Sequence, residues 1–346
     1  MTSANKQNDP MIESFLAGTE WDGWAITDLS GDASNRSYKR LIHPTDARTV
    51  VLMIAPPEKG KSVVEFLTIG AHLHAVGLSA PKIMKCDDSA GLMVLEDLGD
   101  DLFAKVVANN PKQERPLYQA AVDVLVQLQS VAPPPNTAAY GVPIMTKLAA
   151  LAFDWYLFGC TGQHTHDAKE HFQHKFSAML QSLPQHNLVL ILRDYHAENL
   201  IWLPHRTGAK KVGLLDFQDA MIGSQAYDLV SLLEDARRDV SPAVQHEMQQ
   251  HFMKHSGMDE AAFHREYAIM GAQRNLRIVG VFARLSLYYG KPHYVNYLPR
   301  VWENLMRNLS HPDLAEVKET VLAHLPEPTP DILETLKNKC ATVHSL

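Results

Sequence analysis

Residues 187–220 read NLVLILRDYHAENLIWLPHRTGAKKVGLLDFQDA. Two short apolar runs in this stretch, LIWL and VGLL, flank the polar turn PHRTGAKK, and this pattern predicts a β-hairpin. The hairpin would bring the loop that holds Asp194 and Asn199 beside Asp216. One carboxylate could then receive a proton, while an amide and a second carboxylate could hold Mg²⁺.

The spacing of these three residues is that of a kinase catalytic loop. An Asp is followed five residues later by Asn199, and Asp216-Phe217 comes 17 residues after that Asn. The motif D-x-x-x-x-N alone occurs by chance in many chains. Together with the flanking strands and a β-rich region upstream, it favours phosphoryl transfer. The alternative interpretation is a pair of buried polar residues that cap turns.

The composition is that of an ordinary globular chain. Of its 346 residues, 46% are hydrophobic, and 32 Lys and Arg against 39 Asp and Glu give a net charge of −7. This acidic balance argues against a nucleic-acid partner. Three scattered cysteines, a polar N-terminus and the lack of a long apolar run predict a cytoplasmic protein with no disulfide framework and no membrane partner. We expect a monomer.

The first 97 residues read mainly as short strands separated by turns. Asp9-Pro10 predicts the start of a brief helix, with Asp as the cap and Pro at the first helical position. We expect a five-stranded, largely antiparallel sheet with one inserted helix. The predicted strands are 24–29, 37–42, 49–55, 82–86 and 92–96, and the helix is 62–76.

After Gly99 the apolar residues recur at helical spacing. Helices are predicted at 113–131, 143–158, 168–183, 225–237, 242–255, 261–287 and 295–307, with shorter ones toward the C-terminus. The predicted fold class is therefore α+β, with a small sheet lobe at 1–97 and a large helical lobe at 98–346. Ligands commonly bind between two such lobes.

Six stretches of the chain resemble, in order, the aminoglycoside phosphotransferase and choline kinase superfamily, the small-molecule relatives of protein kinases. More narrowly, they resemble the bacterial anomeric sugar kinases that act on N-acetylmuramate and N-acetylglucosamine in cell-wall (peptidoglycan) recycling. The stretches are GDASNRSYKR (31–40), VVLMIAPPE (50–58), GLMVLEDLGDDLF (91–103), RDYHAENLIWLP (193–204), VGLLDFQDAMIGSQAYDLVSLLEDARRDV (212–240) and RNLRIVGVFARLSLYYGKPHYVNYLPRVW (274–302).

This resemblance implies a protein-kinase-like two-lobe fold and a role for each motif residue. Asp194 would be the catalytic base, and Asn199 and Asp216 would bind Mg²⁺. Asp228 would brace the catalytic loop by hydrogen bonds, and His196 would order its loop or contact phosphate or acceptor. The backbone at Glu96 and Leu98 would meet the adenine of ATP, and one loop would cover its phosphates: Gly31, Asp32, Ala33, Ser34, Asn35 and Arg36.

The sequence departs from the superfamily pattern at three positions. Leu192 stands where a His is usual, and Arg193 stands where small-molecule kinases often have Gly. Met53 occupies the strand position at which many members carry a Lys that contacts the ATP phosphates. We expect Glu65 to be a solvated surface residue, so no Lys–Glu pair can be assigned. Arg36 and Arg40 are candidate replacements for the missing Lys.

The predicted acceptor side has an uneven charge balance. Residues 271–302 contain five basic residues, four tyrosines and no Asp or Glu. Such a segment would repel a polycationic aminoglycoside and suits a sugar that carries a carboxylate. Arg277 and Arg284 are therefore candidate acceptor-binding residues. The alternative is a basic helix face on the protein surface.

The sequence thus predicts an enzyme, an ATP- and Mg²⁺-dependent phosphotransferase that acts on an alcohol group. We expect the acceptor to be the anomeric hydroxyl of a small amino sugar. Two alternatives remain open: a phosphotransferase for aminoglycosides or other small alcohols, and a catalytically silent nucleotide-binding module. A protein kinase is disfavoured because no A-P-E segment follows Asp216.

Overall fold

The structure is a computed structural model that describes residues 9–29, 36–56, 63–184 and 188–344. The chain separates into two compact units. The sheet unit contains residues 1–103 together with 199–219, and the helical unit contains 104–198 together with 220–346. The boundary at residue 97 between a nucleotide-binding lobe and an acceptor-binding lobe remains a prediction. The two compact units have different bounds, because the sheet unit extends to residue 103 and includes residues 199–219.

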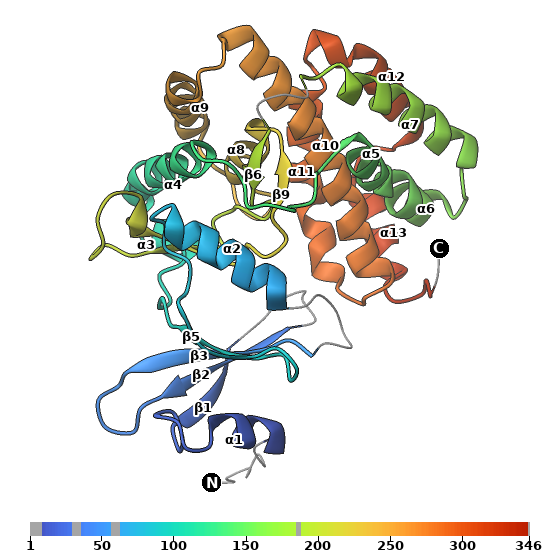
Figure 1. Cartoon of the computed structure of the whole chain (residues 1–346). Helices are drawn as coiled ribbons and strands as arrows, with labels where there is room; N and C mark the ends of the chain where they lie inside the picture. The colour runs from blue at the N-terminus through green and yellow to red at the C-terminus, as the bar shows by residue number, and fades with distance from the viewer. Residues whose placement is uncertain (1–8, 30–35, 57–62, 185–187, 345–346) are drawn as a thin grey trace. The chain divides into compact units, whose positions relative to one another are not determined.

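The sheet unit confirms the predicted five-stranded sheet. Its strands pair antiparallel in the order β1-β2-β3-β5-β4 (Figure 1). The elements are α1 (Pro10–Leu16), β1 (Ala25–Leu29), β2 (Ser37–Ile42), β3 (Thr49–Ile54), α2 (Val63–Ala75), β4 (Ile83–Asp87) and β5 (Leu92–Glu96). The helix start predicted at Asp9-Pro10 is also confirmed, since the Asp9 carboxylate accepts a hydrogen bond from the Met11 N–H at 3.0 Å.

Helix α1 packs against one face of the five-stranded sheet. Successive residues of a strand point to opposite faces, so Val50 and Leu52 lie on one face and Met53 on the other. Val50 and Leu52 pack with Phe15 of α1 in a buried cluster. Figure 1 shows α1 and α2 on opposite sides of the sheet. Met53 has no exposed surface, whereas most residues of β1 and β2 are exposed or half-buried.

The predicted hairpin is present and belongs to the sheet unit. β7 (Leu200–Trp202) pairs antiparallel with β8 (Val212–Leu214). The Leu214 N–H donates to the Ser79 carbonyl at 2.8 Å. Beyond β8, Phe217 is fully buried with its ring centroid 4.7 Å from that of Phe66 on α2. These contacts fix the residues on either side of the hairpin.

The helical unit holds the remaining elements. They are α3 (Phe103–Asn109, which starts at the unit boundary), α4 (Glu114–Gln129), α5 (Val142–Ala149), α6 (Phe158–Thr161), α7 (His166–Gln181), α8 (Ala226–Leu233), α9 (Pro242–Ser256), α10 (Glu260–Leu287), α11 (Leu298–Asn308), α12 (Ala315–His324) and α13 (Pro330–Asn338). A short pair of strands, β6 (Val189–Ile191) and β9 (Met221–Gly223), precedes and follows the catalytic loop and hairpin. None of the described helices is long and apolar enough to cross a membrane.

Two features of this unit differ from the sequence prediction. The helix expected at 143–158 is divided, because a π-helical turn at Ala152–Leu157 separates α5 from α6. This turn packs against α10, the long helix at the centre of the unit in Figure 1. At their contact, a Cβ on Gly280 would come within 2.2 Å of the Leu151 backbone. Only glycine permits this close approach. The short helix α3 was not predicted.

Candidate active site

The loop that carries Asp194 is held by Asp228. The buried Asp228 carboxylate accepts hydrogen bonds from the backbone N–H groups of Leu192 (2.6 Å) and Arg193 (2.8 Å), which confirms the predicted bracing role. Burial raises the pKa of Asp228 to about 7, although the two backbone donors oppose this shift. The carboxylate of α8 therefore fixes the backbone directly before the predicted base.

Arg193 has an unusual backbone conformation for a residue with a side chain. Its φ is +71°, in the left-handed region that favours glycine. A glycine would adopt this conformation without strain. Here the Arg193 guanidinium lies over the ring of Tyr140, 5.2 Å from the ring centroid. This contact and the hydrogen bonds to Asp228 hold the strained turn.

The Asp194 carboxylate lies among cations. Its side chain is 32% exposed, and its Oδ1 lies 4.0 Å from an Nη of Arg277. Desolvation raises the pKa of Asp194, but the surrounding positive charges, led by Arg277, outweigh it and hold the pKa below its ordinary value. Asp194 is thus ionised at neutral pH and can accept a hydrogen bond from a hydroxyl group.

Arg277 belongs to a polar network in the helical unit. Its second Nη donates to the Tyr227 hydroxyl at 3.4 Å. The Tyr227 and Tyr140 hydroxyls are 3.4 Å apart, and Gln273 donates to Tyr140 at 3.2 Å. Tyr227 on α8 thus holds the Arg277 guanidinium on α10, and the Tyr140 hydroxyl, from the segment before α5, contacts Tyr227. This arrangement keeps Arg277 directed toward Asp194.

His196, two residues after Asp194, is buried. Its Nε2 lies 3.5 Å from the guanidinium of Arg237, which also pairs with Glu198 at 2.9 Å. Burial lowers the pKa of His196. Contact of this histidine with an acceptor or a phosphate remains a prediction.

The two predicted metal ligands lie in the sheet unit. The chain passes from the helical unit to the sheet unit between Glu198 and Asn199. The Leu215 N–H donates to the Asn199 carbonyl at 2.9 Å, so Asn199 and Asp216 leave the hairpin on adjacent strands. Asp216 has a φ of +55°, and its Oδ1 accepts a hydrogen bond from Gln218 at 2.7 Å.

These two side chains suit Mg²⁺ in their chemistry. An amide oxygen and a carboxylate are hard oxygen donors, and Mg²⁺ is usually held by one or two carboxylates together with substrate phosphates. No group of three or more His, Cys, Asp and Glu side chains that could hold a metal occurs among the described residues. Two oxygen donors from the protein fit a metal that is shared with a phosphate ligand.

The predicted phosphate loop falls largely outside the described residues, since residues 31–35 are not described. Arg36 is described, and its side chain hydrogen-bonds Tyr38 on β2. Burial raises the pKa of Tyr38 to about 12, and Asp216 contributes to this shift. Arg36 therefore remains a candidate for the missing strand lysine. The predicted solvated position of Glu65 is confirmed, since it is exposed on α2.

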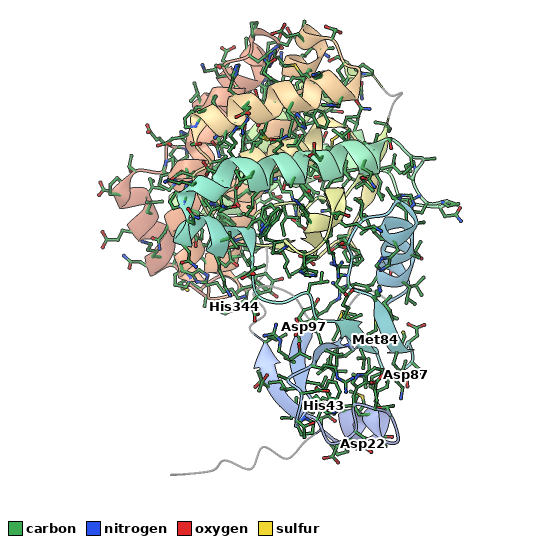
Figure 2. All side chains as sticks on the ribbon, turned by 90° about the vertical axis from the view of Figure 1, so that its left-hand side faces the viewer. Asp22, His43, Met84, Asp87, Asp97 and His344 are labelled. Atoms are coloured by element: carbon green, nitrogen blue, oxygen red, sulfur yellow. The ribbon has the colours of Figure 1, made fainter. Side chains whose placement is uncertain are left out.

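Arg40 was the second candidate, and the structure gives it different partners. Its guanidinium makes two hydrogen bonds to Asp97, at 2.6 and 3.0 Å, and two to Asp100, at 2.8 and 2.9 Å. Asp97, labelled in Figure 2, directly follows β5 and also accepts from the Gly99 N–H. Arg40 therefore clamps the segment after β5. In the sequence, the acidic residues near 97–101 were the feature that could have indicated partners for Arg40.

The same segment is held from its other side. Arg206, in the hairpin turn, pairs with Glu96 at 2.7 Å and with Ser79 at 2.8 Å. Between these anchors, Leu98 is buried with Ile201 in a small apolar cluster. The Leu98 N–H and C=O make no hydrogen bond with another described residue. This segment thus presents a fixed, unpaired backbone donor and acceptor.

Comparison with known proteins agrees with this geometry. Residues 25–264 match the family model described as the phosphotransferase enzyme family. The chain is 35% identical to the N-acetylmuramate/N-acetylglucosamine kinase of Caulobacter vibrioides, over 91% of this chain and 96% of that protein. It is 29% identical to the protein of the same name from Pseudomonas aeruginosa, over 88% and 92% of the two chains.

Solved structures share the fold at low identity. The GDP and kanamycin complex of aminoglycoside phosphotransferase APH(2'')-IIIa has a TM-score of 0.59 at 14% identity, over 88% of this chain and 98% of that one. Choline kinase LicA from Streptococcus pneumoniae has a TM-score of 0.56 at 14% identity, over 82% and 93%. The predicted kinase-like α+β fold is confirmed. By its sequence and its fold, this chain belongs to the phosphotransferase enzyme family.

Proposed function

We propose that this phosphotransferase transfers the γ-phosphoryl group of ATP to the anomeric hydroxyl of an acetylated amino sugar, N-acetylmuramate or N-acetylglucosamine. The observation that carries this assignment is the nearly full-length similarity to relatives named N-acetylmuramate/N-acetylglucosamine kinase. The ionised Asp194 on a braced loop supports it, since transfer to a hydroxyl requires a group that orients the nucleophile.

The sheet unit would bind the nucleotide. The unpaired backbone N–H and C=O of Leu98 offer a donor and an acceptor to the edge of a purine, and the apolar cluster with Ile201 offers a surface for its ring. Asn199 and Asp216 would hold Mg²⁺, which when bound offsets the negative charge of the phosphates. Arg36, next to the phosphate loop, would supply a positive charge in place of the strand lysine.

Asp194 would orient the acceptor and receive its proton. A carboxylate with a lowered pKa is a weak base, and it suits an acidic hydroxyl better than an ordinary alcohol. The anomeric hydroxyl of a sugar is such a group, because the ring oxygen withdraws electrons from the same carbon. The loose transition state of phosphoryl transfer also demands little proton removal before the phosphate moves.

The acceptor would lie against the helical unit. His196 and Arg277 flank Asp194, and Arg284 lies two turns further along α10. The acid-free segment 271–302 favours a neutral or anionic sugar over a polycation. Polar side chains around an ionised base are what a hydroxyl-rich ligand requires.

ADP release from ATP and Mg²⁺ in the presence of a panel of acceptors tests the proposal. We expect turnover with N-acetylmuramate and N-acetylglucosamine, and loss of the reducing end in the product identifies the anomeric position. Faster turnover of kanamycin or choline would assign another acceptor. Nucleotide binding without turnover of any acceptor would indicate a silent module, for which the buried Met53 in place of Lys is the supporting observation.

A further inference from the structure

Arg277 and Arg284 lie on one face of α10. Seven residues of an α-helix make a rotation of about 700°, only about 20° short of two full turns, and an axial rise of about 10 Å. Tyr288 follows one turn beyond Arg284, so these three side chains form a stripe. The stripe begins at Asp194, because Arg277 lies 4.0 Å from its carboxylate.

The two arginines differ in their partners. Arg277 faces the Asp194 carboxylate and donates to the Tyr227 hydroxyl, so its planar fork is already engaged. Arg284 makes no side-chain hydrogen bond or ion pair with any described residue, and its Nε is buried without a partner. A half-buried guanidinium without an anion or acceptor is unusual, since buried polar groups are normally hydrogen-bonded.

Arg284 is half-buried on α10, between two contacts that this helix makes with the π-helical turn region. α10 touches the π-helical turn region twice, at Gly280 against Leu151 and at Tyr288 against Trp155, whose ring centroids are 6.0 Å apart. Arg284 lies between these contacts along the helix. Tyr288, one helical turn beyond Arg284, is 44% exposed, so part of its surface faces solvent. Single-turn π-helices also occur frequently at functional sites.

We propose that Arg284 is the carboxylate-binding residue of the acceptor site, with the exposed ring of Tyr288 as the apolar surface near it, and that Arg277 instead positions Asp194. The assignment rests on the proposed sugar-kinase function. An unpaired guanidinium can take a carboxylate in bidentate fashion, and an aromatic ring can pack against the apolar face of a sugar. The ligand class is a sugar that carries a carboxylic acid substituent.

The two roles have different consequences for two related substrates. N-acetylmuramate carries a carboxylate, and N-acetylglucosamine does not. Loss of a charged hydrogen bond reduces kcat/KM by about 10- to 150-fold. We expect this loss for N-acetylmuramate in Arg284→Ala, with less than about threefold loss for N-acetylglucosamine. Arg284→Lys should recover part of it, because lysine keeps the charge but lacks the fork.

Arg277→Ala should instead reduce kcat for both sugars alike, because Arg277 affects the reaction by positioning Asp194. It should also move the acid limb of the pH–rate profile upward, since Arg277 lowers the pKa of Asp194. Arg300→Ala is the matched control: this arginine of the same acid-free segment already pairs with Asp239. Arg300→Ala should leave kcat/KM nearly unchanged for both sugars.

Calorimetry measures the binding of each sugar without turnover. It therefore tests the carboxylate site separately from the proposed kinase function. A wild-type protein that binds N-acetylmuramate through Arg284 but phosphorylates neither sugar would overturn the proposed function and keep the carboxylate site. Turnover of both sugars with equal losses in Arg284→Ala would overturn the carboxylate site and keep the function. If the wild-type protein neither binds nor phosphorylates either sugar, both assignments are wrong.

Discussion

The substitution Asp228→Asn removes the brace of the catalytic loop without changing its size. The carboxylate accepts two hydrogen bonds, from the N–H groups of Leu192 and Arg193, and it is fully buried. Asparagine has one carbonyl oxygen, so its NH₂ would face one of these donors. A lost hydrogen bond to a buried charge and an unsatisfied donor each cost about 1.5–3 kcal/mol. Both figures describe the same N–H group and do not add, so we expect a loss of about 1.5–3 kcal/mol in the free energy of unfolding.

The size of this loss should depend on pH. The pKa of Asp228 is about 7 in the folded protein and about 3.9 in an unfolded chain. Because the pKa is higher in the folded protein, the unfolded chain loses this proton at a lower pH. The contribution of Asp228 to the stability of the wild-type protein therefore falls as the pH rises from about 4 to 7. Asparagine does not titrate. The difference between wild type and Asp228→Asn should therefore shrink by roughly 2–3 kcal/mol between pH 5 and pH 8.

Urea unfolding at pH 5 and pH 8, followed by circular dichroism, measures this difference. Asp313→Asn is the control, because Asp313 forms an exposed pair with Arg265, and such pairs contribute less than about 1 kcal/mol. In parallel, kcat of Asp228→Asn should fall, since Asp194 loses its fixed backbone. A stability difference that is the same at both pH values would refute the raised pKa. Unchanged stability and turnover would refute the brace itself.

Three further outcomes are expected. Asp194→Asn should reduce kcat by about 10²–10⁴ and leave the nucleotide affinity nearly unchanged. An unchanged kcat at saturating acceptor would show that Asp194 is not the catalytic base. Asp216→Ala should abolish the Mg²⁺ dependence of ATP binding in calorimetry, and retained dependence would place the metal elsewhere. Arg40→Ala should raise KM for ATP more than it lowers kcat, because the segment that holds Leu98 loses its clamp. Lys39→Ala is the control, because Lys39 lies next to Arg40 on β2 and pairs with Asp28 on β1. Equal changes in the KM for ATP in both variants would contradict the clamp.

Local patterns in the sequence predicted much of the fold. Alternating apolar residues and turn residues located every strand of the five-stranded sheet to within one residue at each end. The hairpin that ends at Asp216 was predicted from two apolar runs and a polar turn. Such elements are readable because their side-chain period and turn chemistry are local properties.

Other features followed from contacts that local patterns do not encode. The helix predicted at 143–158 has a continuous helical period, yet it is interrupted by a π-turn where it packs against α10 at Gly280. The segment 199–219 joins the sheet unit through Ser79 and Phe66, which lie more than a hundred residues earlier. No local signal in the segment itself identifies those partners.

The sequence by itself predicted the family and the bracing role of Asp228, both of which are confirmed, because motif spacing is read along one stretch of chain. The same spacing is the source of the proposed roles of Asp194, Asn199 and Asp216. The tertiary structure alone decided which of the candidate arginines have partners among the described residues. Arg40 was a candidate for the phosphates until Asp97, 57 residues away, was found beside it. Arg277 and Arg284 are both arginines of the same acid-free segment, but within the described part of the chain only Arg277 has a carboxylate opposite it. Charge partners come from distant elements, so the role of each arginine follows from folding.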